Sequence, residues 1–383
     1  MLSSLTDIVS PIAVSQFLQA FHEKKRLHIK TTDPTRGESL LPWHDIETMI
    51  SMRSFDDMQV MQSGMPLPPQ LYTATDMSDF HDILAQGASV VLRQIQLNIP
   101  QIQWLATAIE RQMGFTVGVN AYLSFSRGGA FKPHWDKHDV LVVQLHGRKA
   151  WRLWDGKFKN PIESSSNAKY EISDAHSEEL ELSPGDALYI PRGEAHAASV
   201  SAGASVHLTF GLDCLNGVDV LQQLNHAVGQ DEFLRANLPP QAAEAQLRDY
   251  EAELKARLHR LVDALDIAEF LKEDDANRPP IRHASLPAAE QPSDILRLTL
   301  RRRVRLPDGS SAESQPVTIG GVAYALSPAA IDILRQLFGN DCQSRSALSA
   351  ALSPLHTTSA VMAGLSELLR LGFLMTDRTD RAV

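Results

Sequence analysis

Short β-branched and aromatic segments recur between Phe115 and Asp213, and they restrict the fold more than any other feature of this chain. Gly, Pro, Asn and Asp, the residues that dominate turns, separate each segment from the next. The segments read TVGVNAYLSF, DVLVVQLHG, KAWRLWD, EELELSPGDALYIP and SVHLTFGL. Closely spaced short strands with turn signals between them are typical of an antiparallel sandwich or barrel. We therefore predict an all-β core over this region.

Helical patterns flank the β region on both sides. Before it, VSQFLQAFHEKK, LPWHDIETMI and FHDILAQGASVVL have apolar residues at helical spacing, which predicts a helical lead-in. After it, apolar residues form one stripe at three- and four-residue spacing: Leu247, Tyr250, Leu254, Leu258, Leu261 and Leu265. This stripe predicts either a helix that faces a core or a helical contact between two subunits.

A proline-rich segment, DDANRPPIRHASLPAAEQPSD, has no periodicity and is interpreted as a linker. Beyond it, SPAAIDILRQLF, SALSAALS and TSAVMAGLSELLRLGFL predict three helices, and Gly372 predicts a turn into a closing strand. Three short helices with a β-ribbon suggest a winged-helix-like module. The predicted division is 1–213 for the β domain with its lead-in, 214–275 for a helical dimerisation domain, 276–291 for the linker and 292–383 for the last module.

Composition argues against several classes of protein. The net charge of -10 disfavours a surface built for nucleic acid, and the last module carries ten Arg against eight Asp plus Glu, a net of about +2. The only cysteines, Cys214 and Cys342, form no C-x-x-C pair, which disfavours a disulfide framework and a thiolate zinc site. No leader pattern is evident and the apolar runs are too short to span a bilayer, so we expect a soluble, cytoplasmic protein without a membrane partner.

Ionisable residues are concentrated in the segment FKPHWDKHDVLVVQLHGRKAWRLWDG. On a strand, residues i and i+2 share a face, so His134 and Asp136 are able to bind one ion together. His196, after the turn in PGDALYIPRGEAH, is the candidate third ligand. Two imidazoles and one carboxylate on one face of a metal are the arrangement of non-haem Fe(II) oxygenases. An isolated H-x-D is common by chance, and the interpretation depends on all three residues lying in one β region.

The same segment resembles a known family. Pro133-His134-Trp135-Asp136, Gly147-Arg148-Lys149 and the later P-G-D-A-L-Y-I-P-R-G-E-A-H resemble the cupin-like JmjC oxygenases of the ribosomal-oxygenase group. The resemblance is specific over about Asn120 to Gly211. It implies a jelly-roll (double-stranded β-helix) fold, followed by a helical middle domain and a winged-helix-like end.

The resemblance also implies roles for single residues. The family's metal ligands correspond to His134, Asp136 and His196. A basic residue fifteen positions after the first histidine binds the distal carboxylate of 2-oxoglutarate in this family, and that position is Lys149 here.

Four further residues lie on neighbouring strands of the predicted core. Asn120 and Tyr122 precede the motif on an alternating strand, where either a hydrogen bond to the co-substrate or a structural role is open. His207 is interpreted as a hydrogen-bonded core histidine and Trp151 as plain core.

The implied activity is hydroxylation of a side chain in a protein or peptide, classically a ribosomal protein, with Fe(II), 2-oxoglutarate and O2. The family commonly dimerises through its helical middle, so a homodimer is expected. Two enzyme alternatives keep the iron chemistry: hydroxylation of a peptide natural product, and removal of an N-methyl group. Two other classes stay open: a non-catalytic metal-binding cupin scaffold, and a DNA-binding regulator suggested by the basic run at Arg301-Arg302-Arg303.

Overall fold

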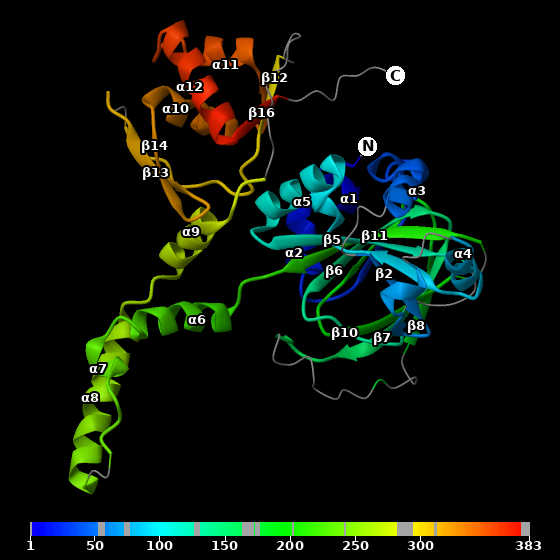
Figure 1. The fold of residues 1–383 in the computed structure, drawn as a ribbon, viewed down its shortest axis with the longest axis horizontal. Helices are drawn as coiled ribbons and strands as arrows, with labels where there is room; N and C mark the ends of the chain where they lie inside the picture. Colours follow the sequence, from blue (N-terminus) through cyan, green and yellow to red (C-terminus); the bar gives the residue numbers. More distant parts are fainter. Residues whose placement is uncertain are drawn as a thin grey trace. The chain divides into compact units, whose positions relative to one another are not determined.

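The structure, a computed structural model, has two compact units, Met1–Cys214 and Leu215–Val383, each with its own hydrophobic core (Figure 1). The residues that it describes are 2–52, 58–72, 77–125, 131–162, 172, 177–200, 203–240, 243–281, 294–309 and 312–376.

The first unit is built on an eight-stranded antiparallel sheet with the order β1-β9-β6-β11-β5-β4-β2-β3. Its strands are β1 (Leu27–Ile29), β2 (Met58–Gln62), β3 (Met65–Pro66), β4 (Ser89–Leu92), β5 (Thr116–Ser124), β6 (Asp139–His146), β9 (Ala187–Ile190) and β11 (Ser205–Asp213). A second sheet, of order β10-β7-β8, faces it (Figure 1). This sheet contains β7 (Lys149–Lys157), β8 (Ser177–Leu182) and β10 (Glu194–Ser199). The two antiparallel sheets form the predicted jelly roll.

The lead-in contributes helices and also strands. Its helices are α1 (Leu5–Val9), α2 (Val14–Ala20), α3 (Trp43–Met52), α4 (Ser78–Ala85), α5 (Pro100–Met113) and the short 3-10 turns Glu38–Leu40, Pro69–Leu71 and Ile95–Leu97. The predicted helix over FHDILAQGASVVL is wrong in its second half, because SVVL forms β4 and pairs with β5. A run of four residues that is buried on both faces of a sheet shows neither the two-residue period of a half-buried strand nor the 3.6-residue period of a helix. Its sequence therefore cannot be distinguished from that of a buried helix.

Strand alternation divides the large sheet into an outer and an inner face. On β5, Val117, Val119, Ala121 and Leu123 are buried in one cluster with the lead-in helices. The intervening residues, which include Asn120 and Tyr122, point the other way, toward the second sheet. A separate apolar cluster, with Val142, Trp151 and Leu188 among its members, fills part of the space between the sheets. The polar residues of the candidate site lie beside that cluster.

The second unit begins with four helices: α6 (Gly217–Val228), α7 (Glu232–Arg235), α8 (Glu244–Asp263) and α9 (Ile267–Asn277). Helix α8 carries most of the predicted apolar stripe, yet none of its residues is buried. The interpretation as a core-facing helix is therefore wrong for the single chain. Leu247 and Leu258 remain 49% and 36% exposed. Helix α9 continues to Asn277, past the predicted start of the linker, and most of the linker lies outside the described residues.

A mixed module follows. Its elements are β12 (Ile295–Leu298), β13 (Gln315–Ile319), β14 (Val322–Leu326), α10 (Pro328–Leu337), β15 (Cys342–Ser344), α11 (Arg345–Leu352), α12 (Thr358–Leu371) and β16 (Leu374–Thr376). The three predicted helices and the closing strand are present, and Gly372 ends α12 with a φ of 76°, a conformation that favours glycine. That this module is winged-helix-like remains a prediction.

The basic run Arg301-Arg302-Arg303 is not fully solvated. Arg302 is only 4% exposed and its guanidinium lies 3.2 Å from Asp275 of α9. The preceding strand β12 is central in its sheet, between β15 and β16. In the described part of the chain, no helix combines the length and the apolar character that a membrane crossing requires.

Candidate active site

His134 and His196 lie directly opposite each other. Two backbone hydrogen bonds join them, from His134 N to His196 O at 3.1 Å and from His196 N to His134 O at 2.8 Å. His196 belongs to β10, but His134 forms only an isolated bridge and Asp136 lies in the loop before β6. The prediction of one strand for the H-x-D motif is therefore wrong in detail. The bridge nevertheless places the two imidazole rings 4.6 Å apart.

Both imidazoles have a fixed tautomer. His134 Nδ1 lies 2.9 Å from the carbonyl oxygen of Lys132, and His196 Nδ1 lies 3.1 Å from that of Glu194. A carbonyl oxygen only accepts, so each Nδ1 is the donor and carries the proton. Nε2 of each ring is then the atom that a metal would bind, as is usual for metal-bound histidines; in His196 this atom also faces Asp136, which raises the pKa of His196 against the effect of burial.

Asp136 completes the group, called the triad below. One ligand atom from each of His134, Asp136 and His196 lies within 4.8 Å of the other two, and Asp136 Oδ2 is 3.4 Å from His196 Nε2. Burial alone would raise the pKa of Asp136, but the two histidines hold it below its ordinary value. Burial and His196 lower the pKa of His134. A carboxylate and a neutral imidazole are the forms that bind a divalent metal.

Lys149 is a fully enclosed lysine. It is 2% exposed at the start of β7, and its Nζ donates to Ser124 Oγ at 3.2 Å. No carboxylate among the described residues pairs with it, and burial lowers the pKa of Lys149 to about 7. A buried ammonium without an anion is costly, so this position suits the binding of an anionic ligand.

Aromatic rings line the space between Lys149 and the triad. Tyr122 stacks on His207 with ring centroids 5.0 Å apart, and Trp151 lies 5.5 Å from His207 and 6.0 Å from His196. His207 Nδ1 and Trp151 Nε1 are buried and have no hydrogen-bond partner. His207 is buried, as its interpretation as a core histidine requires, but its Nδ1 is not hydrogen-bonded. Both unpartnered nitrogen atoms are available to a polar ligand in this interior.

Asn120 and Tyr122 share the inner face of β5. Asn120 Oδ1 accepts from the backbone of Gln94 at 3.1 Å, which gives that side chain a structural role. The side chain of Tyr122 is hydrogen-bonded to that of Asn120. Burial, together with the negative charge of Asp136, raises the pKa of Tyr122 to about 12. Its hydroxyl is thus a neutral donor at physiological pH. Ser124, which contacts Lys149, was missed, although the alternation of Asn120 and Tyr122 would have placed it on the same face.

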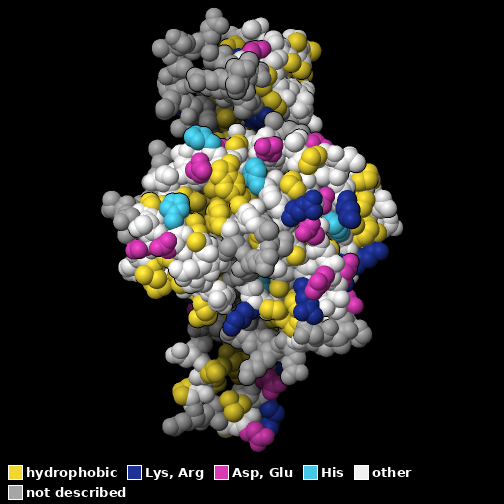
Figure 2. Space-filling model, turned by 90° about the vertical axis from the view of Figure 1, so that its right-hand side faces the viewer, with side chains coloured by type: hydrophobic (Ala, Val, Ile, Leu, Met, Phe, Trp, Pro, Cys, Tyr) yellow, Lys and Arg dark blue, Asp and Glu magenta, His cyan; other side chains and the backbone are white. Residues whose placement is uncertain are grey.

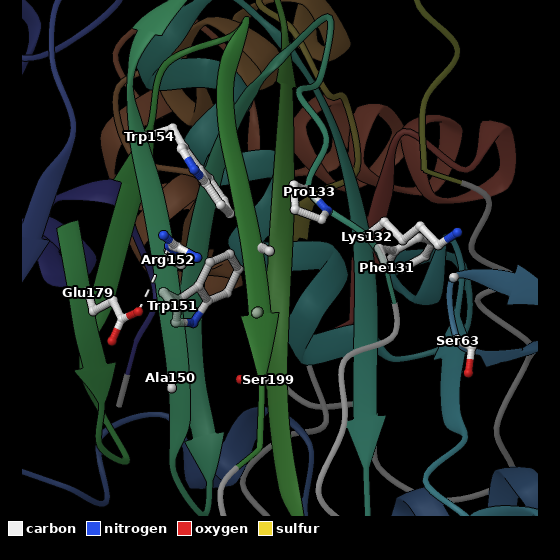
Figure 3. A pocket seen from close by; sticks show the side chains of 13 residues that line it. Ser63, Phe131, Lys132, Pro133, Ala150, Trp151, Arg152, Trp154, Glu179 and Ser199 are labelled. Carbon is white, nitrogen blue, oxygen red and sulfur yellow. Dashed lines mark ion pairs between the residues drawn. The ribbon is translucent and has the colours of Figure 1, made fainter. Parts of the chain in front are cut away.

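A cavity of about 660 Å³ is lined by Phe131 and Trp151, whose rings contact the triad histidines, although no triad residue lines it (Figure 3). Phe131 on one side lies 5.5 Å from the ring of His134, and Trp151 on the other lies against His196. Figure 3 shows Arg152 and Glu179 beside Trp151, with Lys132 across the cavity. The remaining lining residues are Ser63, Gly64, Pro133, Ala150, Trp154, Ala197, Ala198 and Ser199. This cavity could not be predicted from the sequence, because its two sides come from segments far apart in the chain.

Residues 91–220 match the profile of the JmjC domain family. A protein of Drosophila persimilis named as a bifunctional lysine-specific demethylase and histidyl-hydroxylase NO66 is 27% identical over 223 residues, covering 54% of this chain and 31% of the fly protein. Ribosomal oxygenase 2 of Mus musculus is 26% identical over 309 residues, covering 75% of this chain and 66% of the mouse protein. The chain thus spans about a third of the length of the fly relative.

Solved structures show the same fold. YcfD, a ribosomal oxygenase from Escherichia coli, superposes with a TM-score of 0.59 at 20% identity, covering 96% of this chain and 98% of YcfD. Its complex with cobalt and 2-oxoglutarate superposes equally well, with a TM-score of 0.59 and coverage of 96% and 99%.

Proposed function

The chain carries a JmjC domain of the ribosomal-oxygenase type, and from this premise we propose that it is an Fe(II)- and 2-oxoglutarate-dependent oxygenase acting on a side chain in a protein or peptide. One observation carries the proposal: the triad and Lys149, a buried lysine with no acidic partner among the described residues, border the same interior, which Trp151 and His207 line. A scaffold protein that only binds metal has no use for the lysine.

The triad would hold the metal. His134 and His196 would bind through Nε2, because each Nδ1 is committed to a backbone carbonyl. Asp136 would supply the one negatively charged ligand. Three protein ligands on one side leave the other coordination positions for the co-substrate and O2. Bound Fe(II), 2-oxoglutarate and O2 would together supply the oxidising chemistry, which is the cofactor's own.

Lys149 would bind the distal carboxylate of 2-oxoglutarate. Lys149 and Leu153 lie on the same face of β7, and Leu153 pairs with His196. The lysine therefore lies on the same sheet as His196 but further along it. A residue that binds the far carboxylate of a metal-bound dicarboxylate must be at such a distance from the metal. Tyr122, His207 and Trp151 lie between the two and offer polar atoms to the remaining oxygens. The aromatic rings would also exclude water from the reacting centre.

The substrate would enter through the cavity beside the triad. Its volume of about 660 Å³ is large enough for a long side chain of a protein substrate. We propose a ribosomal protein, in line with the names of the mouse and bacterial relatives. Ribosomal proteins are generally basic, and the net charge of -10 would favour their approach.

A protein substrate fits the surface better than a nucleic acid does. On the face that Figure 2 displays, the described Lys and Arg side chains are interspersed with Asp and Glu instead of gathered in one stripe. Nucleic-acid binding relies on clustered positive charge. Because neither cysteine forms a disulfide, we further propose that the protein works in the cytoplasm.

We propose that α6–α9 mediate a homodimer. Several large apolar side chains of these helices are exposed in the single chain: Leu221, Leu247, Leu258, Val262, Ile267 and Leu271. Exposed apolar residues at helical spacing are typical of a subunit contact. Light scattering at micromolar concentration should report twice the mass of one chain, and Val262→Glu with Leu258→Glu should halve it. A monomer in the unmutated protein would contradict the proposal.

The activity is tested with the purified full chain, Fe(II) and 2-oxoglutarate, with and without ribosomal proteins. We expect succinate release that depends on the added protein, and a peptide whose mass has increased by one oxygen atom. Formaldehyde release would instead indicate removal of an N-methyl group. His134→Ala is the matched control. Equal succinate release by His134→Ala and the unmutated protein would contradict the proposal.

A further inference from the structure

We propose that the protein binds a second divalent metal ion, of the zinc class, through His22, Asp139 and Cys214. These three residues, called the lead-in cluster below, each offer one ligand atom within 4.8 Å of the other two. They come from three segments: the turn after α2, the first residue of β6, and the residue that follows β11. The cluster is separate from the triad and does not depend on the proposed oxygenase activity.

The imidazole of His22 faces the carboxylate of Asp139. His22 Nε2 lies 3.2 Å from Asp139 Oδ2, is shielded from solvent, and has no hydrogen-bond partner. Stacking on Phe115, with centroids 5.1 Å apart, holds the ring in this orientation. A neutral imidazole nitrogen with a lone pair would be repelled by the carboxylate oxygen. The contact therefore requires either a proton on Nε2, which the neutral Nε2–H tautomer supplies, or a metal ion between the two groups.

Asp139 lacks a positively charged partner other than His22 among the described residues. It is 0% exposed, and its carboxylate accepts hydrogen bonds from Tyr189 Oη at 2.5 Å and from the Arg192 backbone N–H at 2.8 Å. Both donors are neutral. The Arg192 guanidinium is directed to Glu23, at 3.0 Å. Each carboxylate oxygen retains a second lone pair for a metal.

Cys214 supplies the feature that distinguishes this cluster from an ordinary ion pair. The thiol is free and partly buried, and its one described hydrogen bond is a long one of 3.8 Å to the carbonyl oxygen of Leu212. Burial and Asp139 raise the pKa of Cys214, so the thiol keeps its proton until a metal displaces that proton into solvent. A thiolate, an imidazole and a carboxylate together select zinc over magnesium or calcium.

Cobalt(II) distinguishes the two sites in one titration. A thiolate bound to cobalt gives an intense near-ultraviolet charge-transfer band, and the triad contains no sulfur ligand. We expect the full-length protein to bind two equivalents of cobalt(II) and to develop this band. His134→Ala should lose one equivalent and keep the band, whereas Cys214→Ser should lose the other equivalent together with the band. Cys342→Ser, which removes the only other cysteine, should leave both unchanged.

Two results would overturn the proposal. One is the absence of the band in the unmutated protein, which would leave His22 hydrogen-bonded to Asp139 and a thiol that binds no metal. The other is a band that disappears in Cys342→Ser. If Cys214→Ser does not fold, as judged by circular dichroism, the band in a Cys342→Ser, His134→Ala double variant decides the question, because Cys214 is then the only thiol present.

Discussion

The triad and the lead-in cluster contain similar ligand types, and Asp136 and Asp139 are only three residues apart, yet their surroundings are different. The rings that contact the triad histidines line a cavity, and the side chain of Asp136 is 30% exposed. In the lead-in cluster Asp139 is 0% exposed and is covered by the ring of Tyr189, which in turn packs on Phe17 at 4.9 Å. A metal at the triad can exchange ligands with the solvent, and one in the cluster cannot do so easily. A metal site for turnover needs access to solvent and substrate, whereas a metal site for stability does not.

Removal of a triad ligand should have the largest effect on activity. We expect Asp136→Ala to lower turnover at least about a thousand-fold, because several kcal/mol of metal binding and charge stabilisation are lost. The thermal midpoint should move by no more than about 2 °C, since Asp136 is not part of the apolar core. Succinate release and thermal unfolding are measured on the same preparation. Cys214→Ser is the matched control from the other site and should retain turnover.

Lys149→Ala should have the next largest effect, and only on the co-substrate. The variant loses a charge-assisted contact of about 2–4 kcal/mol, which corresponds to roughly a 30- to 1000-fold weaker affinity for 2-oxoglutarate. Metal affinity should be nearly unchanged, because no triad ligand is touched. Lys149→Arg should lose less affinity for 2-oxoglutarate, because a guanidinium also carries a positive charge, although this planar group requires a differently shaped space. Titration of 2-oxoglutarate into the metal-loaded proteins checks this, and equal affinities in Lys149→Ala and the unmutated protein would remove the lysine from the site.

Asp139→Ala should have the opposite effect to Asp136→Ala: it should lower stability and leave turnover nearly unchanged. The hydroxyl of Tyr189 and the backbone N–H of Arg192 would lose their acceptor in a buried position. We expect a loss of about 3 kcal/mol in the free energy of unfolding, because buried unsatisfied donors are costly. Urea denaturation measures this loss, and turnover per folded molecule should change little. If Asp139→Ala proves as stable as Asp136→Ala, the distinction between the two sites fails.

The sequence predicted the β core well because its strands are short and separated by turn residues. Strand alternation also placed Asn120 and Tyr122 on one face of β5, whereas Lys149, on β7 of the opposite sheet, was assigned from the family resemblance. The strands of the lead-in were harder to predict. The segment SVVL of β4 is buried on every side, so its pattern resembles that of a helix.

The lead-in cluster could not be predicted, for a different reason. His22, Asp139 and Cys214 are far apart in sequence, and no spacing rule connects them. The lack of a C-x-x-C pair argued against a thiolate zinc site, but that rule covers only sites whose ligands are close in sequence. Likewise, no sequence pattern could show that Nδ1 of His207 lacks a hydrogen-bond partner, because this depends on how its neighbours pack.

The smallest expected effect is a pH dependence of co-substrate binding. Burial lowers the pKa of Lys149 to about 7, so the ammonium of the free protein loses its proton as the pH rises above that value. Binding of a dicarboxylate favours the charged form and must therefore take up a proton above about pH 7, which weakens the apparent affinity by about tenfold per pH unit. His207, the other titratable group beside Lys149, has its pKa lowered well below its ordinary value by burial and stays neutral there. Lys149→Arg keeps its charge throughout this range and should show no such slope. Calorimetric titration of 2-oxoglutarate in buffers of different ionisation enthalpy measures both the slope and the proton uptake. A pH-independent affinity in the unmutated protein would mean that Lys149 is charged before the ligand arrives, and hence that this interior is more polar than its contacts indicate.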